Sequence, residues 1–209
     1  MKSMVKAEIK NIIFDLGGVI LNLAVENTHR EFARLSGLPI EEIKTKVHHG
    51  DFFHAYERGL ISDSEFRNSL RQSLNVHAPD ADLDNAWNAM LLDIPHERFA
   101  LLERLKQTHR LFLLSNTNEI HRQCFNAHVQ HASGKPAIDH YFHQAYFSHL
   151  LKLSKPDLAI YQHVLTDQNL VPHQTVFLDD NPDNLAGAAK AGIHTFHVQH
   201  PNQIFDFFA

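Results

Sequence analysis

Short apolar runs alternate with helical patterns over most of this chain. The strand-like runs are Ile12–Asp15, Leu111–Leu114, Ala145–Ser148, Val176–Asp179 and Thr195–Val198. Between the later runs, residues 156–169 place Ile160, Val164 and Leu165 on one side of a helix. Because strands that alternate with helices favour right-handed crossovers, we predict a parallel sheet. The expected fold class is α/β, with a three-layer Rossmann-like core.

A second helix in the later part of the chain has clear start and stop signals. Asn181 is a favourable N-cap, and Pro182 stands at the first helical position, where a missing N–H costs nothing. The alanine-rich stretch that follows ends at Gly192. Its small side chains would let this helix lie close to the sheet.

The stretch from residue 22 to residue 92 has a different pattern, with several helical segments and no convincing strand. One helix begins at Ser62, and Glu65 three residues later completes a capping box. A helical bundle inserted after the first strand would stand above the carboxyl end of that strand, where it could act as a lid. We therefore expect a core formed by residues 1–21 and 93–209 and a cap formed by residues 22–92.

Composition narrows the class of protein. The chain has 209 residues, of which 44% are hydrophobic and 21% charged, as in an ordinary globular protein. A formal net charge of −5 without a basic tract argues against nucleic acid or an anionic membrane as partner. The single cysteine, Cys124, fits a reducing compartment, and residues 1–10 are too weakly apolar for a signal peptide. We expect a cytoplasmic enzyme, as a monomer or weak dimer.

Four polar pieces fall at the carboxyl ends of the predicted strands. They are Asp15 before a glycine turn, Ser115 with Asn116, Lys155 before a helix, and the pair Asp179-Asp180. Each alone has an ordinary explanation as a turn or cap residue. Together they are much less easily accidental, because ligands bind at this edge of open α/β sheets. Clustered carboxylates at one edge favour a bound divalent cation.

The order of these motifs resembles the haloacid dehalogenase superfamily of phosphohydrolases over nearly the whole chain. Phe14-Asp15-Leu16-Gly17-Gly18-Val19 is similar to its nucleophile loop, and Leu114-Ser115-Asn116 is similar to its second motif. Lys155-Pro156 resembles the third motif, and Leu178-Asp179-Asp180-Asn181 resembles the acidic fourth motif. The helical insert has the position of the family's type 1 cap.

This resemblance implies a role for each residue of the site. Asp15 is the nucleophile that forms an aspartyl phosphate, which water later hydrolyses. The cofactor is Mg²⁺, held by Asp15, Asp180 and the Gly17 carbonyl, with Asp179 bound directly or through water. Lys155 adds positive charge, since a carboxylate that attacks a phosphate dianion meets repulsion. The Ser115 hydroxyl and the N–H of Asn116 bind the equatorial phosphate oxygens.

Gly17 departs from the family's common pattern, in which a second aspartate at this position serves as general acid and base. Loss of such a group typically costs about 10²–10⁴-fold in rate. Three explanations are open. The leaving group needs little proton help, as an anomeric hydroxyl does; or a cap residue replaces the aspartate; or the chain binds phosphorylated ligands and turns over poorly. The cap candidates are His48, His49, His54 and Glu57.

Within the cap, residues 48–59 resemble the bacterial glucose-1-phosphate phosphatase subgroup, which also carries glycine at the position of Gly17. The expected function is therefore Mg²⁺-dependent hydrolysis of a small phosphosugar such as glucose 1-phosphate. His49 and Arg58 are candidate substrate-binding residues. The aromatic residues of this segment either line the sugar pocket or form the core of the bundle; they are Phe52, Phe53 and Tyr56.

Two other functions compete with this prediction. A haloacid dehalogenase also lacks the second aspartate, but it uses no metal, and the adjacent Asp179 and Asp180 would then repel each other without a cation. A binding protein for phosphorylated ligands or protein partners would explain Gly17 without any catalysis. Sensitivity to a metal chelator separates the first alternative, and tight binding without turnover identifies the second.

Overall fold

The computed structural model describes residues 8–48 and 51–208 and confirms the α/β fold. Five parallel strands form the sheet: β1 (Asn11–Phe14), β2 (Arg110–Ser115), β3 (Gln144–Phe147), β4 (Thr175–Asp179) and β5 (His194–His197). The strand order is β3-β2-β1-β4-β5. Each observed strand lies within one residue of its predicted position. All four residues of β1 are buried, as expected for a central strand with helices on both faces.

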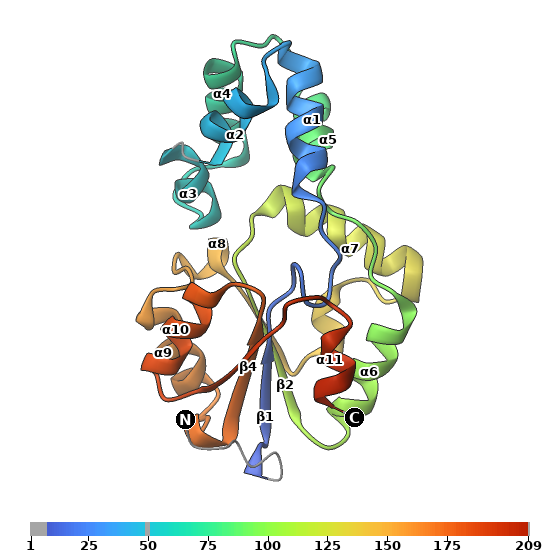
Figure 1. The fold of residues 1–209 in the computed structure, drawn as a ribbon, viewed down its shortest axis with the longest axis vertical. Coiled ribbons are helices and arrows are strands. Elements are labelled where there is room, and N and C mark those ends of the chain that lie inside the picture. Colours follow the sequence, from blue (N-terminus) through green and yellow to red (C-terminus); the bar gives the residue numbers. More distant parts are fainter. Residues whose placement is uncertain (1–7, 49–50, 209) are drawn as a thin grey trace.

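Helices cover both faces of this sheet, which gives the three layers in Figure 1. One face packs against α9 (Leu158–Asp167) and α10 (Pro182–Lys190). The other face packs against α6 (His96–Lys106), α7 (Glu119–Ser133) and α11 (Gln203–Phe207). Asn181 caps α10 as predicted, since its side chain accepts a hydrogen bond from the backbone N–H of Asp183. The short helix α8 (Ser148–Leu151) follows β3 directly.

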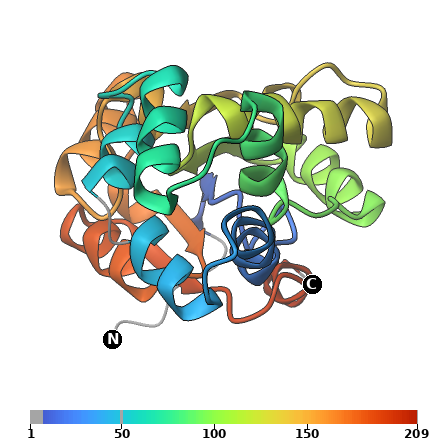
Figure 2. The same ribbon diagram turned by 90° about the horizontal axis from the view of Figure 1, so that it is seen from above.

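The remaining helices stand above the carboxyl ends of the strands, as Figures 1 and 2 show. They are α1 (Val25–Ser36), α2 (Ile40–His48), α3 (Asp51–Glu57), α4 (Asp63–Leu74) and α5 (Asp80–Asn88). These helices bury a hydrophobic core of their own, with Phe66 and Trp87 near its centre. The capping box at the start of α4 is confirmed, because Ser62 and Glu65 bond each other's backbone N–H groups.

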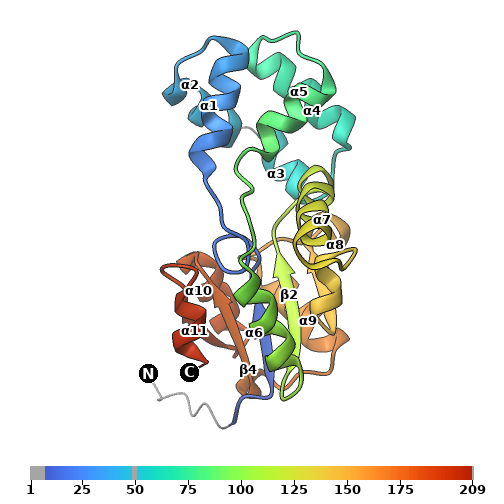
Figure 3. The same ribbon diagram turned by 90° about the vertical axis from the view of Figure 1, so that its right-hand side faces the viewer.

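Two connecting segments join this helical bundle to the core and lie side by side in Figure 3. Backbone hydrogen bonds tie them together: Asn22 N–H to Asp93 O at 3.0 Å, Leu92 N–H to Asn22 O at 3.0 Å, and Ala24 N–H to Met90 O at 2.9 Å. The bundle is therefore held on a paired neck. Across residues 8–48 and 51–208, the helices all fall short of what is needed to cross a bilayer in length or in apolar character.

Candidate active site

Lys155 lies between two carboxylates at the carboxyl edge of the sheet. Its Nζ is 2.8 Å from Asp15 Oδ1 and 2.7 Å from Asp179 Oδ2, and only 1% of the side chain is exposed. Burial alone would lower the pKa of this ammonium, but the attraction of Asp15 and Asp179 raises it. Because β1 pairs with β4, the two acids sit at neighbouring strand ends. The structure thus places a permanent cation beside the predicted nucleophile.

Asp15 is held rigidly at the end of β1. Its backbone N–H donates to Leu178 O at 2.9 Å, and its Oδ1 accepts the N–H of Leu16 at 2.7 Å. Burial raises the pKa of Asp15 to about 7, although Lys155 acts in the opposite direction. A carboxylate in this setting is poorly solvated, which favours the approach of positive charge.

Asp179 has no exposed surface and is surrounded by donors. Its Oδ1 accepts from the Asn181 N–H at 2.7 Å and from Asn184 Nδ2 at 3.0 Å. Its Oδ2 accepts from Lys155 Nζ at 2.7 Å and from Asn184 Nδ2 at 3.1 Å. A carboxylate has about four acceptor positions, so protein donors already occupy those of Asp179.

Asp180 differs from its neighbour because its side chain is exposed. Partial burial of its carboxyl group, together with the nearby Asp179 charge, nevertheless raises the pKa of Asp180. Gly18 packs directly against it: a Cβ at Gly18 would lie only 2.3 Å from Asp180 Oδ2. Gly18 also has a φ of +71°, so a side chain is excluded by both space and backbone conformation.

The three carboxylates form one oxygen-only group. Ligand atoms of Asp15, Asp179 and Asp180 all lie within 4.8 Å of one another. Three negative charges face the single positive charge of Lys155, which leaves an excess that a dication would neutralise. Carboxylate oxygen is the ligand that Mg²⁺ prefers, so the residues present fit this ion. The predicted ligand role of the Gly17 carbonyl stays a prediction.

Asn116 and Ser115 take up different positions at the end of β2. The Asn116 side chain forms a reciprocal pair with the Lys155 backbone, with both hydrogen bonds at 2.9 Å. It therefore positions the loop that carries Lys155, and only its backbone N–H is left as the predicted phosphate donor. The hydroxyl-bearing Ser115 is buried and lines the cavity described below.

The turn at the end of α3 is fastened to the core. Ser148 Oγ donates to the Glu57 carbonyl at 2.6 Å and accepts from the Thr117 N–H at 2.9 Å. One residue earlier, the Tyr56 hydroxyl accepts from the Ile120 N–H at 3.3 Å. Because Ser148 is completely buried, it fixes the backbone of Glu57 against the carboxyl edge of the sheet.

The next two residues of this turn also contact the core. Arg58 Nη2 is 2.6 Å from Asp157 Oδ2, and this ion pair is half exposed. At Gly59, with φ at +63°, an added Cβ would lie 2.0 Å from the His149 carbonyl oxygen. Arg58, a predicted substrate-binding residue, thus bonds an acid two residues after Lys155. His49, the other predicted substrate contact of the cap, lies outside the described residues.

A cavity of about 100 Å³ lies between the bundle and the core. Its polar lining comes from Gly17, Glu57, Ser115–Thr117 and His121, and its apolar lining is Leu16, Leu21, Leu23, Phe53, Trp87, Met90, Leu91 and Phe125. Trp87 stacks on His121 with a centroid distance of 4.7 Å. Of the three aromatic residues left open by the sequence, Phe53 lines the cavity, whereas Tyr56 stacks on Phe66 in the bundle core.

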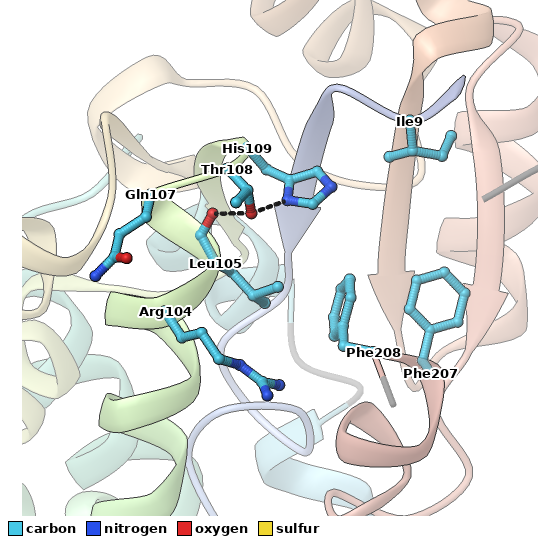
Figure 4. Close-up of a pocket in the computed structure, with 8 residues that line it drawn as sticks. All are labelled: Ile9, Arg104, Leu105, Gln107, Thr108, His109, Phe207 and Phe208. Carbon is cyan, nitrogen blue, oxygen red and sulfur yellow. Dashed lines mark hydrogen bonds between the residues drawn. The ribbon is translucent and has the colours of Figure 1, made fainter. Parts of the chain in front are cut away.

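A roomier hollow, of about 430 Å³, lies at the opposite edge of the sheet (Figure 4). It is lined by Ile9 and by residues just before β2, together with Phe207 and Phe208 of the C-terminal segment. No carboxylate of the cluster reaches this edge, since the acids lie at the other ends of the strands. A choice of the functional site by cavity volume alone would therefore favour the edge of the sheet that lacks the acidic cluster.

Sequence reasoning missed three residues that shape the site: Asn184, Ser148 and Asp157. Asn184 lies in the first turn of α10, three residues after its cap, so helical periodicity could have placed it beside Asp179. Asp157 follows the Lys155-Pro156 motif directly. Ser148 gave no signal, because its partners Glu57 and Thr117 are far away in the sequence.

Comparisons with known protein families, curated proteins and solved structures agree on one family. Residues 9–192 match the haloacid dehalogenase-like hydrolases. A D-ribitol-5-phosphate phosphatase of Bacteroides thetaiotaomicron is 27% identical over 191 residues, which cover 91% of this chain and 92% of that protein.

Solved structures show the same likeness. The HAD family enzyme bt-2542 of B. thetaiotaomicron superposes with a TM-score of 0.83 at 34% identity, over 90% of this chain and 93% of that chain. A second structure of that enzyme, in complex with magnesium and inorganic phosphate, has a TM-score of 0.81. An HAD-like family hydrolase of Porphyromonas gingivalis has a TM-score of 0.82 at 30% identity, over 91% of each chain.

Proposed function

This chain belongs to the haloacid dehalogenase-like hydrolase family as a phosphatase that uses Mg²⁺, and we propose that it releases phosphate from a small phosphorylated sugar or sugar alcohol. The single observation that carries this proposal is the buried Lys155 between Asp15 and Asp179, with the exposed Asp180 beside them. Such a cluster can receive a phosphate dianion only when further positive charge is added, which agrees with a metal-dependent reaction.

In the proposed reaction, Asp15 attacks phosphorus and forms an aspartyl phosphate, which water then hydrolyses. Mg²⁺ bound by the acidic cluster would supply positive charge to the phosphate oxygens. Lys155 holds Asp15 in place and reduces its repulsion of the incoming dianion. Ser115 and the N–H of Asn116 donate hydrogen bonds to the equatorial oxygens, whose charge must be stabilised in the transition state.

We assign different roles to the two adjacent acids. Asp180 is exposed at the carboxyl edge and would hold the metal directly, together with Asp15 and the Gly17 carbonyl. Asp179 already accepts four hydrogen bonds, so we place its contact with the metal through water. Its main task is then to orient Lys155.

We propose that residues 22–92 form the cap that selects the substrate. The cavity of about 100 Å³ below it is small, which favours a small leaving group. Glucose 1-phosphate and D-ribitol 5-phosphate, the latter from the name of the Bacteroides relative, are the first substrates to test. His49 and Arg58 remain the candidate cap contacts. With its single cysteine, we place the protein in the cytoplasm, as a monomer or weak dimer.

Phosphate release with Mg²⁺ tests this function. The wild type should hydrolyse at least one of glucose 1-phosphate, D-ribitol 5-phosphate and p-nitrophenyl phosphate, and EDTA should stop the reaction. Asp15→Asn should lose turnover by several orders of magnitude, because an amide is not a nucleophile for phosphorus. Asp206→Asn, an exposed acid on α11, is the matched control and should behave as wild type. Equal rates in the wild type and Asp15→Asn would refute the proposal.

One observation keeps the ligand-binding alternative in view. A Cβ at Gly17 would lie 2.7 Å from Leu23 Cδ1, so the space of the family's second aspartate is filled by an apolar side chain. Tight binding of a sugar phosphate with no release of phosphate would favour this alternative. Turnover that survives EDTA would instead favour dehalogenase-like, metal-free chemistry.

A further inference from the structure

The proposed reaction lacks an evident proton donor. An alkoxide that leaves phosphorus needs a proton, and the residue at the usual position of the acid is Gly17. The tip of the Leu23 side chain lies 2.7 Å from where a Cβ of Gly17 would be, so an apolar group occupies the start of the missing side chain. The donor must therefore come from another side of the cavity.

Glu57 faces this cavity from the cap. It lines the cavity with Gly17 and Ser115, opposite the carboxyl end of β1. Its backbone is fixed by the buried Ser148 hydroxyl, and the residues on either side of it, Tyr56 and Arg58, also bond the core. The backbone that carries this carboxyl group is thus held by three consecutive residues at the edge of the cavity.

Building on the proposed function, we propose that Glu57 is the general acid and base of this phosphatase, supplied by the cap in place of the side chain that Gly17 lacks.

The electrostatic surroundings support this role. Burial raises the pKa of Glu57 to about 7, and Lys155 on the core side opposes this shift. A general acid works best when its pKa is near the operating pH. His121, the neighbouring ionisable group on α7, has its pKa lowered to about 3 by burial and is neutral. Arg58 is bound to Asp157, and Asp15 is bound to Lys155.

The other candidates of the cap are less well placed. The His54 side chain is exposed and does not line the cavity. The side chain of His48 and the whole of His49 lie outside the described residues. Among the described residues that line the cavity, Glu57 is the carboxyl group that faces the leaving-group side.

The proton balance closes over the two steps. In the first, an Asp15 oxygen bonds to phosphorus, the bond from phosphorus to the leaving oxygen breaks, and that oxygen takes the proton of Glu57. In the second, the Glu57 carboxylate takes a proton from water as the water oxygen bonds to phosphorus. The bond to Asp15 then breaks, which releases inorganic phosphate and leaves Asp15 ionised and Glu57 protonated.

A leaving-group comparison tests the proposal. Glu57→Gln keeps the size of the side chain but cannot donate a proton as an acid. The kcat/KM of an alkyl ester, D-ribitol 5-phosphate, should fall by about 10²–10⁴-fold. The kcat/KM of p-nitrophenyl phosphate, which reports only the steps up to release of the leaving group, should fall by less than about tenfold because this leaving group needs little protonation. Glu41→Gln, an exposed glutamate on α2, is the matched control. Equal losses of kcat/KM on both classes of ester would overturn the role.

The pH profile gives a second readout that a merely structural residue would not change. Only protonated Glu57 can donate, so kcat/KM for the alkyl ester should fall as the pH rises through about 7. This falling limb should vanish in Glu57→Gln, and its survival there would also overturn the role.

Restoring an acid at the usual position completes the test. In the Glu57→Gln background, Gly17→Asp combined with Leu23→Ala should recover alkyl-ester turnover, because Leu23 then vacates the required space. If the wild type hydrolyses no phosphate ester or Asp15→Asn stays active, the proposed function itself fails, which is a different outcome from a loss of selectivity in Glu57→Gln.

Discussion

The two sides of the proposed active site, a core wall at the carboxyl edge of the sheet and a cap wall above it, are built on opposite principles. The core wall, formed by Asp15, Lys155, Asp179 and Asp180, consists of charged groups locked together by short hydrogen bonds. The cap wall, formed by the aromatic and apolar residues of the bundle, carries a single carboxyl group, that of Glu57. Charge on the core wall suits the phosphoryl group, which every substrate shares. The apolar cap wall can vary with the leaving group without disturbing that chemistry.

The comparison also shows where rigidity comes from. On the core wall, Asp179 is saturated by donors from its own strand end and helix, so the geometry is fixed within the core. On the cap wall, Glu57 ends a helix of the bundle, and its backbone is fixed against the core by a contact that crosses between the two. Substitutions in the core wall should therefore abolish activity, whereas substitutions in the cap wall should lower activity only in part.

The largest effect is expected from Lys155→Met. Removal of the cation leaves Asp15 and Asp179 buried without their shared partner, which should cost about 3–5 kcal/mol in the free energy of unfolding. Turnover should fall by several orders of magnitude. The loss of stability should grow as the pH rises from about 5 to 8, since protonation relieves the unpaired acids at low pH. Urea unfolding at several pH values measures it.

Lys190→Met is the control for that variant, because Lys190 is an exposed lysine at the end of α10. It should leave both unfolding and turnover unchanged. A Lys155→Met protein as stable as the wild type at pH 8 would contradict the view that the core wall depends on this cation.

Metal binding should have the next largest effect on stability. Mg²⁺ at 100 times its dissociation constant should stabilise the protein by about 2.7 kcal/mol. Because the pKa of Asp15 is raised to about 7, protons compete with the ion, and the stabilisation should shrink as the pH falls from 8 to 5. Thermal unfolding with and without Mg²⁺ measures this shift.

The same pKa has a consequence without metal. A carboxyl group whose pKa is raised on folding contributes stability that is complete below its unfolded value of about 4. That contribution is lost as the pH approaches 7.

A substitution at Asp180 tests its role as a metal ligand. Asp180→Asn should remove most of the stabilisation by Mg²⁺, and Asp183→Asn on the exposed side of α10 should keep it. An undiminished effect in Asp180→Asn would contradict its role as a ligand.

The smallest effect is expected at the cap wall from Arg58→Gln. The ion pair of Arg58 and Asp157 is 41% and 51% exposed, and such pairs contribute about 0.2–1 kcal/mol. If Arg58 only tethers the cap, KM should rise by about fivefold or less. Asp157→Asn should then match it, and the double variant should add nothing further. A much larger rise for Arg58→Gln than for Asp157→Asn would show that Arg58 contacts the substrate.

Local patterns explain why the fold could be predicted closely. The strand runs are short, buried on both faces and ended by polar residues, so β1 and β4 were located within a residue. The start of α4 at Ser62 followed from the capping box, which is a purely local signal. The helix expected over residues 156–169 is shorter, from Leu158 to Asp167, because helix ends depend on their surroundings.

The site was predictable only in part. Asp15, Lys155, Asp179 and Asp180 could be grouped, because parallel strands deliver their carboxyl ends to one edge. The sequence could not separate the roles of Asp179 and Asp180, which are adjacent and chemically identical. The burial of Asp179 and the four hydrogen bonds that it accepts, one of them from Lys155, distinguish the two acids, and these are properties of the assembled core.

The order of residues alone determined the alternation of strands and helices, the acidic edge and the missing carboxylate at Gly17, since each depends on neighbours within a few positions. Only the tertiary structure decided that Leu23 fills the space beside Gly17 and that Glu57 faces the same cavity. The Glu57 backbone is held beside this cavity by a hydrogen bond from Ser148, which is 91 residues away along the chain. Contacts over such separations follow from how the bundle packs on the core, and no local pattern encodes them.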